Sequence, residues 1–149
     1  MPSAPNRLQS LRAEDIMTRH PVTLDITGTV QDAADLMFAS DVRHILVVTD
    51  RTLVGMISDR DLRSYVLPRS EQILHPDEVR AHMAASVSTV MRSDVITVSP
   101  ETPGAALIDL LLQENIGAVP VLAPNTRELI GMISYVDVLR AIRPFFETV

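Results

Sequence analysis

The sequence predicts a mixed α/β fold (α+β) made of two copies of one β-α-β-β-α motif. The main observation is an internal duplication, because residues 15–24 resemble residues 89–98 at an offset of 74. A second match relates residues 53–61 to residues 129–137 at an offset of 76, and both contain the run Gly-Met-Ile-Ser. The two extra residues fall in the turn 123–128, where insertions are tolerated. Self-similarity of this kind is typical of a repeat architecture.

Each copy is expected to begin with a short strand, at 22–24 and at 95–98. A helix follows in which apolar residues recur at helical spacing. Thr29 is expected to cap this helix in the first copy. In the second copy Thr102 is expected to cap it, with Pro103 at the first helical position.

Two strands joined by a turn, and then a second helix, complete each copy: 44–49, 53–58 and 59–66 in the first, 118–122, 128–134 and 135–142 in the second. One copy has too few elements to bury its apolar faces alone. The two copies are therefore expected to pack together with pseudo-twofold symmetry. The predicted organisation is a disordered tail at 1–10, a first motif at 11–66, a connection with a short helix at 67–88, a second motif at 89–144 and a tail at 145–149.

The composition narrows the function. Hydrophobic residues make up 46% of the chain, which suffices for a core, and the net charge of -6 argues against a nucleic-acid binder or a polybasic membrane-surface domain. The absence of cysteine excludes disulfides, thiolate nucleophiles and cysteine-based zinc sites. No apolar run has the length of a membrane span and the N-terminus lacks the apolar segment of a signal peptide, so a cytoplasmic protein is expected.

The second helix of each copy begins with a repeated polar pattern. Ser58 and Ser134 occupy the expected N-cap positions, and Asp61 and Asp137 follow three residues later. The free N–H groups of a helix N-terminus attract phosphate, and a carboxylate in the first turn is favoured by the helix dipole. Such a carboxylate also offers two acceptor oxygens to the vicinal hydroxyls of a ribose. The same residues could serve as helix caps without any ligand, and both interpretations stay open.

The sequences Gly55-Met-Ile-Ser-Asp-Arg-Asp61 and Gly131-Met-Ile-Ser-Tyr-Val-Asp137, in matching contexts, resemble the CBS domain family in its tandem form, the Bateman module. The resemblance covers about residues 11–143. It implies a regulatory module, often a homodimer, that binds AMP, ADP, ATP, S-adenosylmethionine or NAD in the cleft between the two motifs. This chain resembles a stand-alone version of the module.

The resemblance also assigns roles to residues. It implies ribose binding by Asp61 and Asp137. It implies phosphate or ribose contacts from six residues, Ser58, Ser134, Arg43, His44, Arg60 and Arg92. It implies that adenine lies near four residues of the first strands, Val22, Thr23, Ile96 and Thr97. Because Gly117 and Ala118 replace Arg43 and His44 in the second copy, one phosphate-binding end is expected to be well supplied with charge and the other poorly.

The preferred hypothesis is a sensor without catalytic activity that binds an adenine nucleotide, AMP or ATP, and signals to a partner protein. The alternatives are a structural dimerisation module without ligand and a sensor of another adenosyl ligand. An enzyme is disfavoured because no nucleophile and base converge in the pattern. No cofactor, metal site, nucleic-acid partner or membrane partner is predicted.

Overall fold

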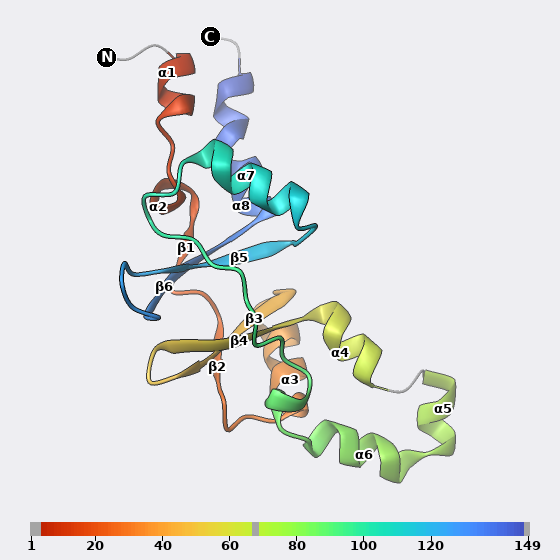
Figure 1. The fold of residues 1–149 in the computed structure, drawn as a ribbon. Coiled ribbons are helices and arrows are strands. Elements are labelled where there is room, and N and C mark those ends of the chain that lie inside the picture. The colour runs from red at the N-terminus through yellow and green to blue at the C-terminus, as the bar shows by residue number, and fades with distance from the viewer. Residues whose placement is uncertain (1–3, 67–68, 148–149) are drawn as a thin grey trace. The chain divides into compact units, whose positions relative to one another are not determined.

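The computed structural model describes residues 4–66 and 69–147 and confirms the mixed α/β class (Figure 1). The chain divides into two compact units. Unit 1 contains residues 1–21 and 96–149, and unit 2 contains residues 22–95. Each unit has its own three-stranded sheet and its own cluster of buried apolar residues.

Unit 2 has the strand order β2-β3-β4. Its first elements are β2 (Thr23–Asp25), α3 (Val30–Ser40), β3 (His44–Thr49), β4 (Thr52–Ser58) and α4 (Asp59–Tyr65). Strand β2 runs parallel to β3, and β4 returns antiparallel to it. Asp50 and Arg51 both have positive φ angles, as a two-residue hairpin turn of this hand requires.

The caps and the apolar stripe of α3 follow the sequence pattern. Thr29 accepts a hydrogen bond from the Asp32 N–H, and the Asp32 carboxylate accepts one from the Thr29 N–H. Val30, Ala33 and Met37 are buried against the sheet, as their helical spacing predicts.

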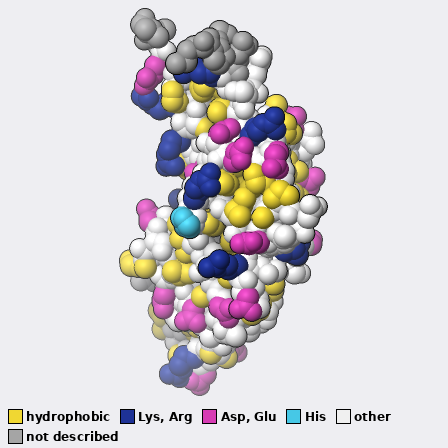
Figure 2. All heavy atoms as spheres, turned by 90° about the vertical axis from the view of Figure 1, so that its left-hand side faces the viewer, with side chains coloured by type: hydrophobic (Ala, Val, Ile, Leu, Met, Phe, Trp, Pro, Cys, Tyr) yellow, Lys and Arg dark blue, Asp and Glu magenta, His cyan; other side chains and the backbone are white. Residues whose placement is uncertain are grey.

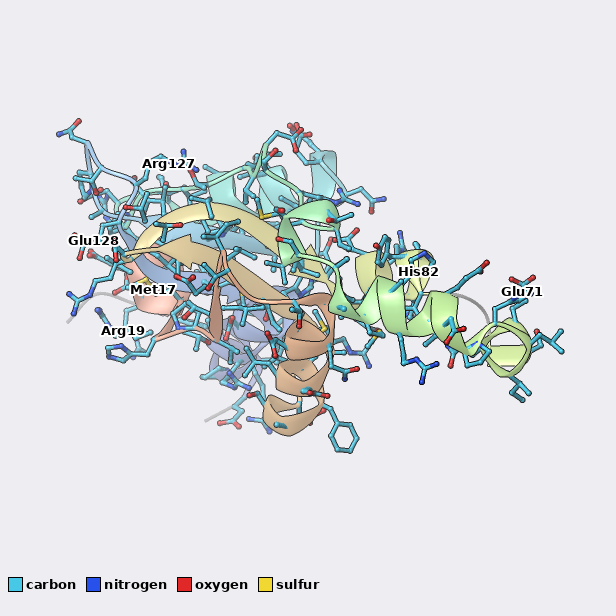
Figure 3. All side chains as sticks on the ribbon, turned by 90° about the horizontal axis from the view of Figure 1, so that it is seen from below. Met17, Arg19, Glu71, His82, Arg127 and Glu128 are labelled. Atoms are coloured by element: carbon cyan, nitrogen blue, oxygen red, sulfur yellow. The ribbon has the colours of Figure 1, made fainter. Side chains whose placement is uncertain are left out.

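The connection between the motifs consists of α5 (Arg69–Leu74), α6 (Pro76–Ala84) and the short 3-10 helix η1 (Val87–Thr89). Helix α6 occupies the place where the sequence predicts a short helix, and Pro76 stands in its first turn. Figure 3 shows α5 and α6, with Glu71 and His82 labelled, extending away from the sheet of unit 2. Residues 67 and 68 lie outside the described residues.

Unit 1 has the strand order β1-β6-β5. Its elements are α1 (Ala4–Gln9), α2 (Ala13–Ile16), β1 (Thr18–Arg19), α7 (Gly104–Gln113), β5 (Ala118–Leu122), β6 (Leu129–Ser134), α8 (Tyr135–Ile142) and the 3-10 helix η2 (Arg143–Phe146). Both chain termini belong to this unit, and Figure 1 shows α1 and the C-terminal helix at the same end of it.

The compact units do not coincide with the motifs predicted at 11–66 and 89–144. Strand β1 precedes the first motif's sheet in sequence, yet it pairs with β6 of the second motif. In unit 2, Met56 and Arg92 exchange two backbone hydrogen bonds of 2.9 Å each. Each motif thus contributes its first segment to the sheet that the other motif builds.

The strand predicted at 95–98 is absent. Val98 makes only an isolated parallel bridge to Val121. In unit 2 the Leu46 N–H donates to the Val22 carbonyl at 3.2 Å and helps to hold β2 in the sheet. Pro120 occupies the position equivalent to Leu46 and has no N–H, so this hydrogen bond cannot form in unit 1.

The predicted start of the second copy's first helix is also wrong by one residue. Pro103 is the N-cap, without a side-chain cap, and α7 begins at Gly104. The Thr102 hydroxyl instead accepts from the Ser99 N–H at 3.2 Å, closing the turn before the helix.

The ends of the chain differ from the predicted tails. Helix α1 covers Ala4–Gln9, where disorder was expected, and the Ser10 hydroxyl donates to the Arg7 carbonyl at its end. Leu11 then packs against the core of unit 1, which ties this segment down. At the other end, η2 extends to Phe146, and residues 148 and 149 lie outside the described residues.

Candidate functional site

The helix start in unit 2 joins Ser58 and Asp61 in a capping box. The Asp61 N–H donates to the Ser58 hydroxyl at 3.1 Å, and the Ser58 N–H donates to Asp61 Oδ2 at 2.9 Å. The other carboxylate oxygen, Asp61 Oδ1, lies 3.5 Å from Arg92 Nε. The prediction that Ser58 is an N-cap is confirmed, and one oxygen of Asp61 is left with a single long ion pair.

The helix start in unit 1 has the same box with one further contact. The Ser134 N–H donates to Asp137 Oδ2 at 2.8 Å, and the Ser134 hydroxyl also contacts Oδ2 at 3.1 Å. The Thr18 hydroxyl donates to Asp137 Oδ1 at 2.7 Å, and Arg140 Nη1 lies 3.4 Å from the same oxygen. Asp137 is only 7% exposed. The prediction that Ser134 is an N-cap is confirmed.

Two glycines allow the first segments to approach these helix starts. A β-carbon at Gly131 would lie 2.5 Å from the Met17 sulfur and 3.1 Å from the Thr18 carbonyl oxygen. A β-carbon at Gly55 would meet the sulfur of Met91 at the same distance. Figure 3 shows Met17 on the segment that enters β1. The glycine of each motif therefore makes room for the methionine that precedes Thr18 or Arg92.

The basic residues predicted to bind phosphate lie in different surroundings. His44 opens β3 and pairs with Ser58 across the ladder. Burial lowers the pKa of His44, against the opposing effect of the nearby Asp61 carboxylate. Burial thus favours the neutral form of the imidazole, which can offer a hydrogen bond.

Arg43 lines a groove of about 1050 Å³ on the helical side of unit 2. The groove lies between side chains of α3, α4 and the α5–α6 connection, and Asp59 and Arg63 share its wall with Arg43. Neither His44 nor Asp61 lines it. Arg60 is exposed on the first turn of α4.

A profile of the CBS domain family matches this chain over two segments, residues 13–68 and 87–144. The chain belongs to the CBS domain family. The two segments follow the two copies that the internal duplication defines.

Individual proteins resemble the chain over most of its length. A CBS domain-containing protein of Dictyostelium discoideum is 29% identical over 141 residues, which cover 91% of this chain and 94% of that protein. A homoserine O-acetyltransferase of Methanohalobium evestigatum is 26% identical over 94% of this chain. The chain spans only 26% of that enzyme's length.

Solved structures of CBS proteins share the fold. AcuB from Vibrio cholerae superposes with a TM-score of 0.73 at 30% identity, covering 93% of this chain and 98% of that one. CBSX2, solved in complex with AMP, has a TM-score of 0.76 at 24% identity, over 91% and 98%. The CBS pair of MJ0100, solved with 5'-methylthioadenosine and S-adenosylmethionine, has a TM-score of 0.71 at 20% identity, over 91% and 98%.

The segments predicted to lie near adenine are divided between the units of this CBS protein. Val22 and Thr23 belong to unit 2 with Asp61, whereas Ile96 and Thr97 belong to unit 1 with Asp137. Thr23 is exposed, and the other three residues are partly buried. Each unit thus holds one candidate adenine segment and one capped carboxylate.

Thr18 is the site residue that the sequence interpretation missed. Its hydroxyl makes the shortest hydrogen bond to either carboxylate. The signal was present, because Thr18 matches Arg92 at the offset of 74 that relates the two CBS motifs.

Within residues 4–66 and 69–147, no three His, Asp or Glu side chains gather where they could hold a metal ion. In the same part of the chain, no helix is long and apolar enough to cross a membrane. Figure 2 shows acidic and basic side chains interspersed on one face, in a chain of net charge -6.

Proposed function

We propose that this CBS protein is a regulatory module that binds an adenine nucleotide, AMP or ATP, and does not catalyse a reaction. The observation that carries the proposal is the start of α4. There Asp61 is fixed by its capping box with one oxygen, while the other oxygen meets, within the described part of the chain, the side chain of Arg92 alone. A fixed carboxylate with an available acceptor suits the hydroxyl pair of a ribose.

The distribution of charge supports a ligand that carries phosphate. In unit 2, Arg60 directly precedes Asp61 in the chain, and Arg92 Nε lies 3.5 Å from Asp61 Oδ1. In unit 1 the positions equivalent to Arg60 and Arg92 hold Val136 and Thr18. Each charge-assisted contact to a phosphate would contribute about 1.5–3 kcal/mol, so unit 2 is the better phosphate-binding half.

The relatives support the class of ligand. CBSX2 was solved with AMP, and the MJ0100 pair with two other adenosyl compounds. Adenosine is common to all of these ligands, and the phosphates distinguish AMP. Binding would shift an equilibrium between two states of the module, and a partner protein would respond to the populated state.

Calorimetry and thermal denaturation with AMP, ATP, NAD and S-adenosylmethionine test the proposal. A ligand at 100 times its Kd stabilises the folded chain by about 2.7 kcal/mol. The Asp61→Ala variant should weaken binding by about 1.5–3 kcal/mol because it removes a charged acceptor. Asp35→Ala, an exposed acidic position on α3, is the matched control and should bind as the wild type does. No response to any of the four ligands would refute the proposal.

A structural dimerisation module is the second candidate, and the surface of α7 and α8 favours it. Leu112, Val136 and Leu139 are 67%, 58% and 62% exposed. Helix α7 carries the exposed Asp109 and is followed by its C-cap Glu114, and α8 carries Arg140. In a twofold dimer through this surface, Asp109 and Glu114 of one protomer would face the arginine on α8 of its partner. A homodimer through this surface is compatible with both functions.

A further inference from the structure

We propose that the two capped carboxylates have different roles: Asp61 binds the ribose, whereas Asp137 is a structural clamp that Thr18 closes. Each chain would therefore bind one adenine nucleotide. The ligand-binding part of this inference rests on the function proposed above, and the clamp does not depend on it.

Each oxygen of Asp137 already accepts a short hydrogen bond. A carboxylate offers about four lone-pair sites, two on each oxygen. Asp137 Oδ2 contacts the N–H and the hydroxyl of Ser134, and Oδ1 contacts the Thr18 hydroxyl and Arg140. The side chain is 8% exposed. A ribose could bind here only by displacing the short hydrogen bond from Thr18.

Asp61 has fewer hydrogen-bond partners than Asp137 and is more exposed. Its Oδ2 accepts from the Ser58 N–H. Among the described residues its Oδ1 has the Arg92 guanidinium at 3.5 Å, which, like the 3.4 Å contact of Arg140 with Asp137, is longer than a normal hydrogen bond. The Arg92 side chain is 61% exposed, so leaving this ion pair costs little. The Asp61 side chain is 16% exposed, twice the value for Asp137.

One residue position accounts for this difference. Thr18 pairs with Met132, and Arg92 bridges Met56, so the backbone stands at the same place in both units. The hydroxyl of threonine is attached to its β-carbon and reaches Asp137 directly. Arginine carries its donors at the end of a long flexible chain and leaves Asp61 open. The side chain at position 18 or 92 thus determines whether the carboxylate is closed or free.

The clamp also connects two elements of unit 1. Thr18 lies in β1 and Asp137 in the first turn of α8, and 119 residues separate them in the chain. A hydrogen bond from a hydroxyl to a buried carboxylate is among the stronger kinds. Its loss would leave Asp137 Oδ1 with only Arg140, so its removal should lower stability even when no ligand is present.

Thermal denaturation without ligand tests the clamp. Asp61→Ala and Asp137→Ala each lose a capping box, so the difference between them reports the contact with Thr18. Asp137→Ala should melt roughly 3–12 °C below Asp61→Ala. Thr18→Val should lower the melting temperature of the wild type but leave that of Asp137→Ala unchanged. Equal melting temperatures for Asp61→Ala and Asp137→Ala, or a Thr18→Val protein as stable as the wild type, would overturn the clamp.

Calorimetry with AMP tests the assignment of the ribose site. The wild type should bind one AMP per chain. Asp61→Ala should weaken binding about 10–100-fold, and Asp137→Ala should retain the affinity within about threefold. Thr18→Val, which frees Asp137 Oδ1, should reveal a second and weaker binding event. Two equal sites in the wild type, or equal losses in the two Ala variants, would overturn the assignment.

The two proposals fail in different ways. A wild type that binds none of AMP, ATP, NAD and S-adenosylmethionine refutes the nucleotide-binding function, and the denaturation experiment still decides the clamp. A wild type that binds AMP through Asp137 keeps the function and refutes the inference. If Asp137→Ala does not fold, Thr18→Val and the stoichiometry of the wild type decide between one site and two.

Discussion

Gly131→Ala tests how the first segment of the chain is seated in unit 1. The new β-carbon would lie 2.5 Å from the sulfur and 3.0 Å from the γ-carbon of Met17, and 3.1 Å from the Thr18 carbonyl oxygen. The Met17 side chain packs against the core of unit 1, and the Thr18 carbonyl belongs to the β1–β6 ladder, so neither group can move without a cost in stability. Overpacking of this kind costs about 1–3 kcal/mol.

Part of this cost is offset in the unfolded state. Alanine restricts the unfolded chain more than glycine does, which contributes about 0.4–1 kcal/mol toward the folded state. For a chain of this size, 1 kcal/mol shifts the melting temperature by about 2–4 °C. Gly131→Ala should therefore melt up to roughly 10 °C below the wild type.

Thermal denaturation followed by circular dichroism measures this shift. Gly104→Ala, at the start of α7, is the control for the carbonyl contact alone, because its β-carbon would meet the Leu11 carbonyl oxygen at 3.1 Å but no side-chain atom closer than 3.8 Å. Gly104→Ala should therefore lose less stability than Gly131→Ala, because it has the carbonyl contact without the contact to a methionine side chain. Adding Met17→Ala should recover part of the loss in Gly131→Ala and none in Gly104→Ala. A Gly131→Ala protein as stable as the wild type would refute the steric argument.

Three further outcomes are expected. Ser134→Ala should lose about 0.5–2 kcal/mol of stability with its cap in a denaturation experiment, whereas Ser64→Ala, on an exposed face of α4, should not. Because burial lowers the pKa of His44, the unfolded chain binds more protons at this residue, so stability should be full above about pH 6.5 and fall as the pH drops below it. Melting curves at several pH values should show this slope, and His44→Gln should reduce it. Leu139→Glu should convert a dimer to a monomer in light scattering, whereas Leu74→Glu, at an equally apolar exposed position on α5, should leave the dimer intact.

Much of the fold could be predicted because the duplication shows the same pattern twice. The apolar spacing of α3 and the Ser-Asp starts of α4 and α8 act locally, so the sequence alone locates them. The strand at 95–98 could not be predicted from its own residues. It fails because Pro120, more than 20 residues later, lacks the donor that a neighbouring strand needs.

The sequence allowed the residues of the candidate site to be predicted, but not the contacts that these residues make. Asp61 and Asp137 lie in the same sequence pattern, and the same role in ribose binding was therefore predicted for both. The structure separates them through Thr18 and Arg92, which lie 119 and 31 residues away from their carboxylates. No local pattern relates residues so distant, and only the pairing of the exchanged first segments brings them together.

The exchanged segments also bear on how such a chain could arise. A polypeptide containing a single copy of the motif would have a first segment without a sheet to join, because that sheet is built by the other copy. Two such polypeptides could complete each other's sheets only by exchanging these segments as separate molecules. Gene fusion makes this exchange intramolecular and raises the effective concentration of the partner sheet. A chain cut after residue 66 should therefore not yield a stable half-protein but should associate with the complementary fragment.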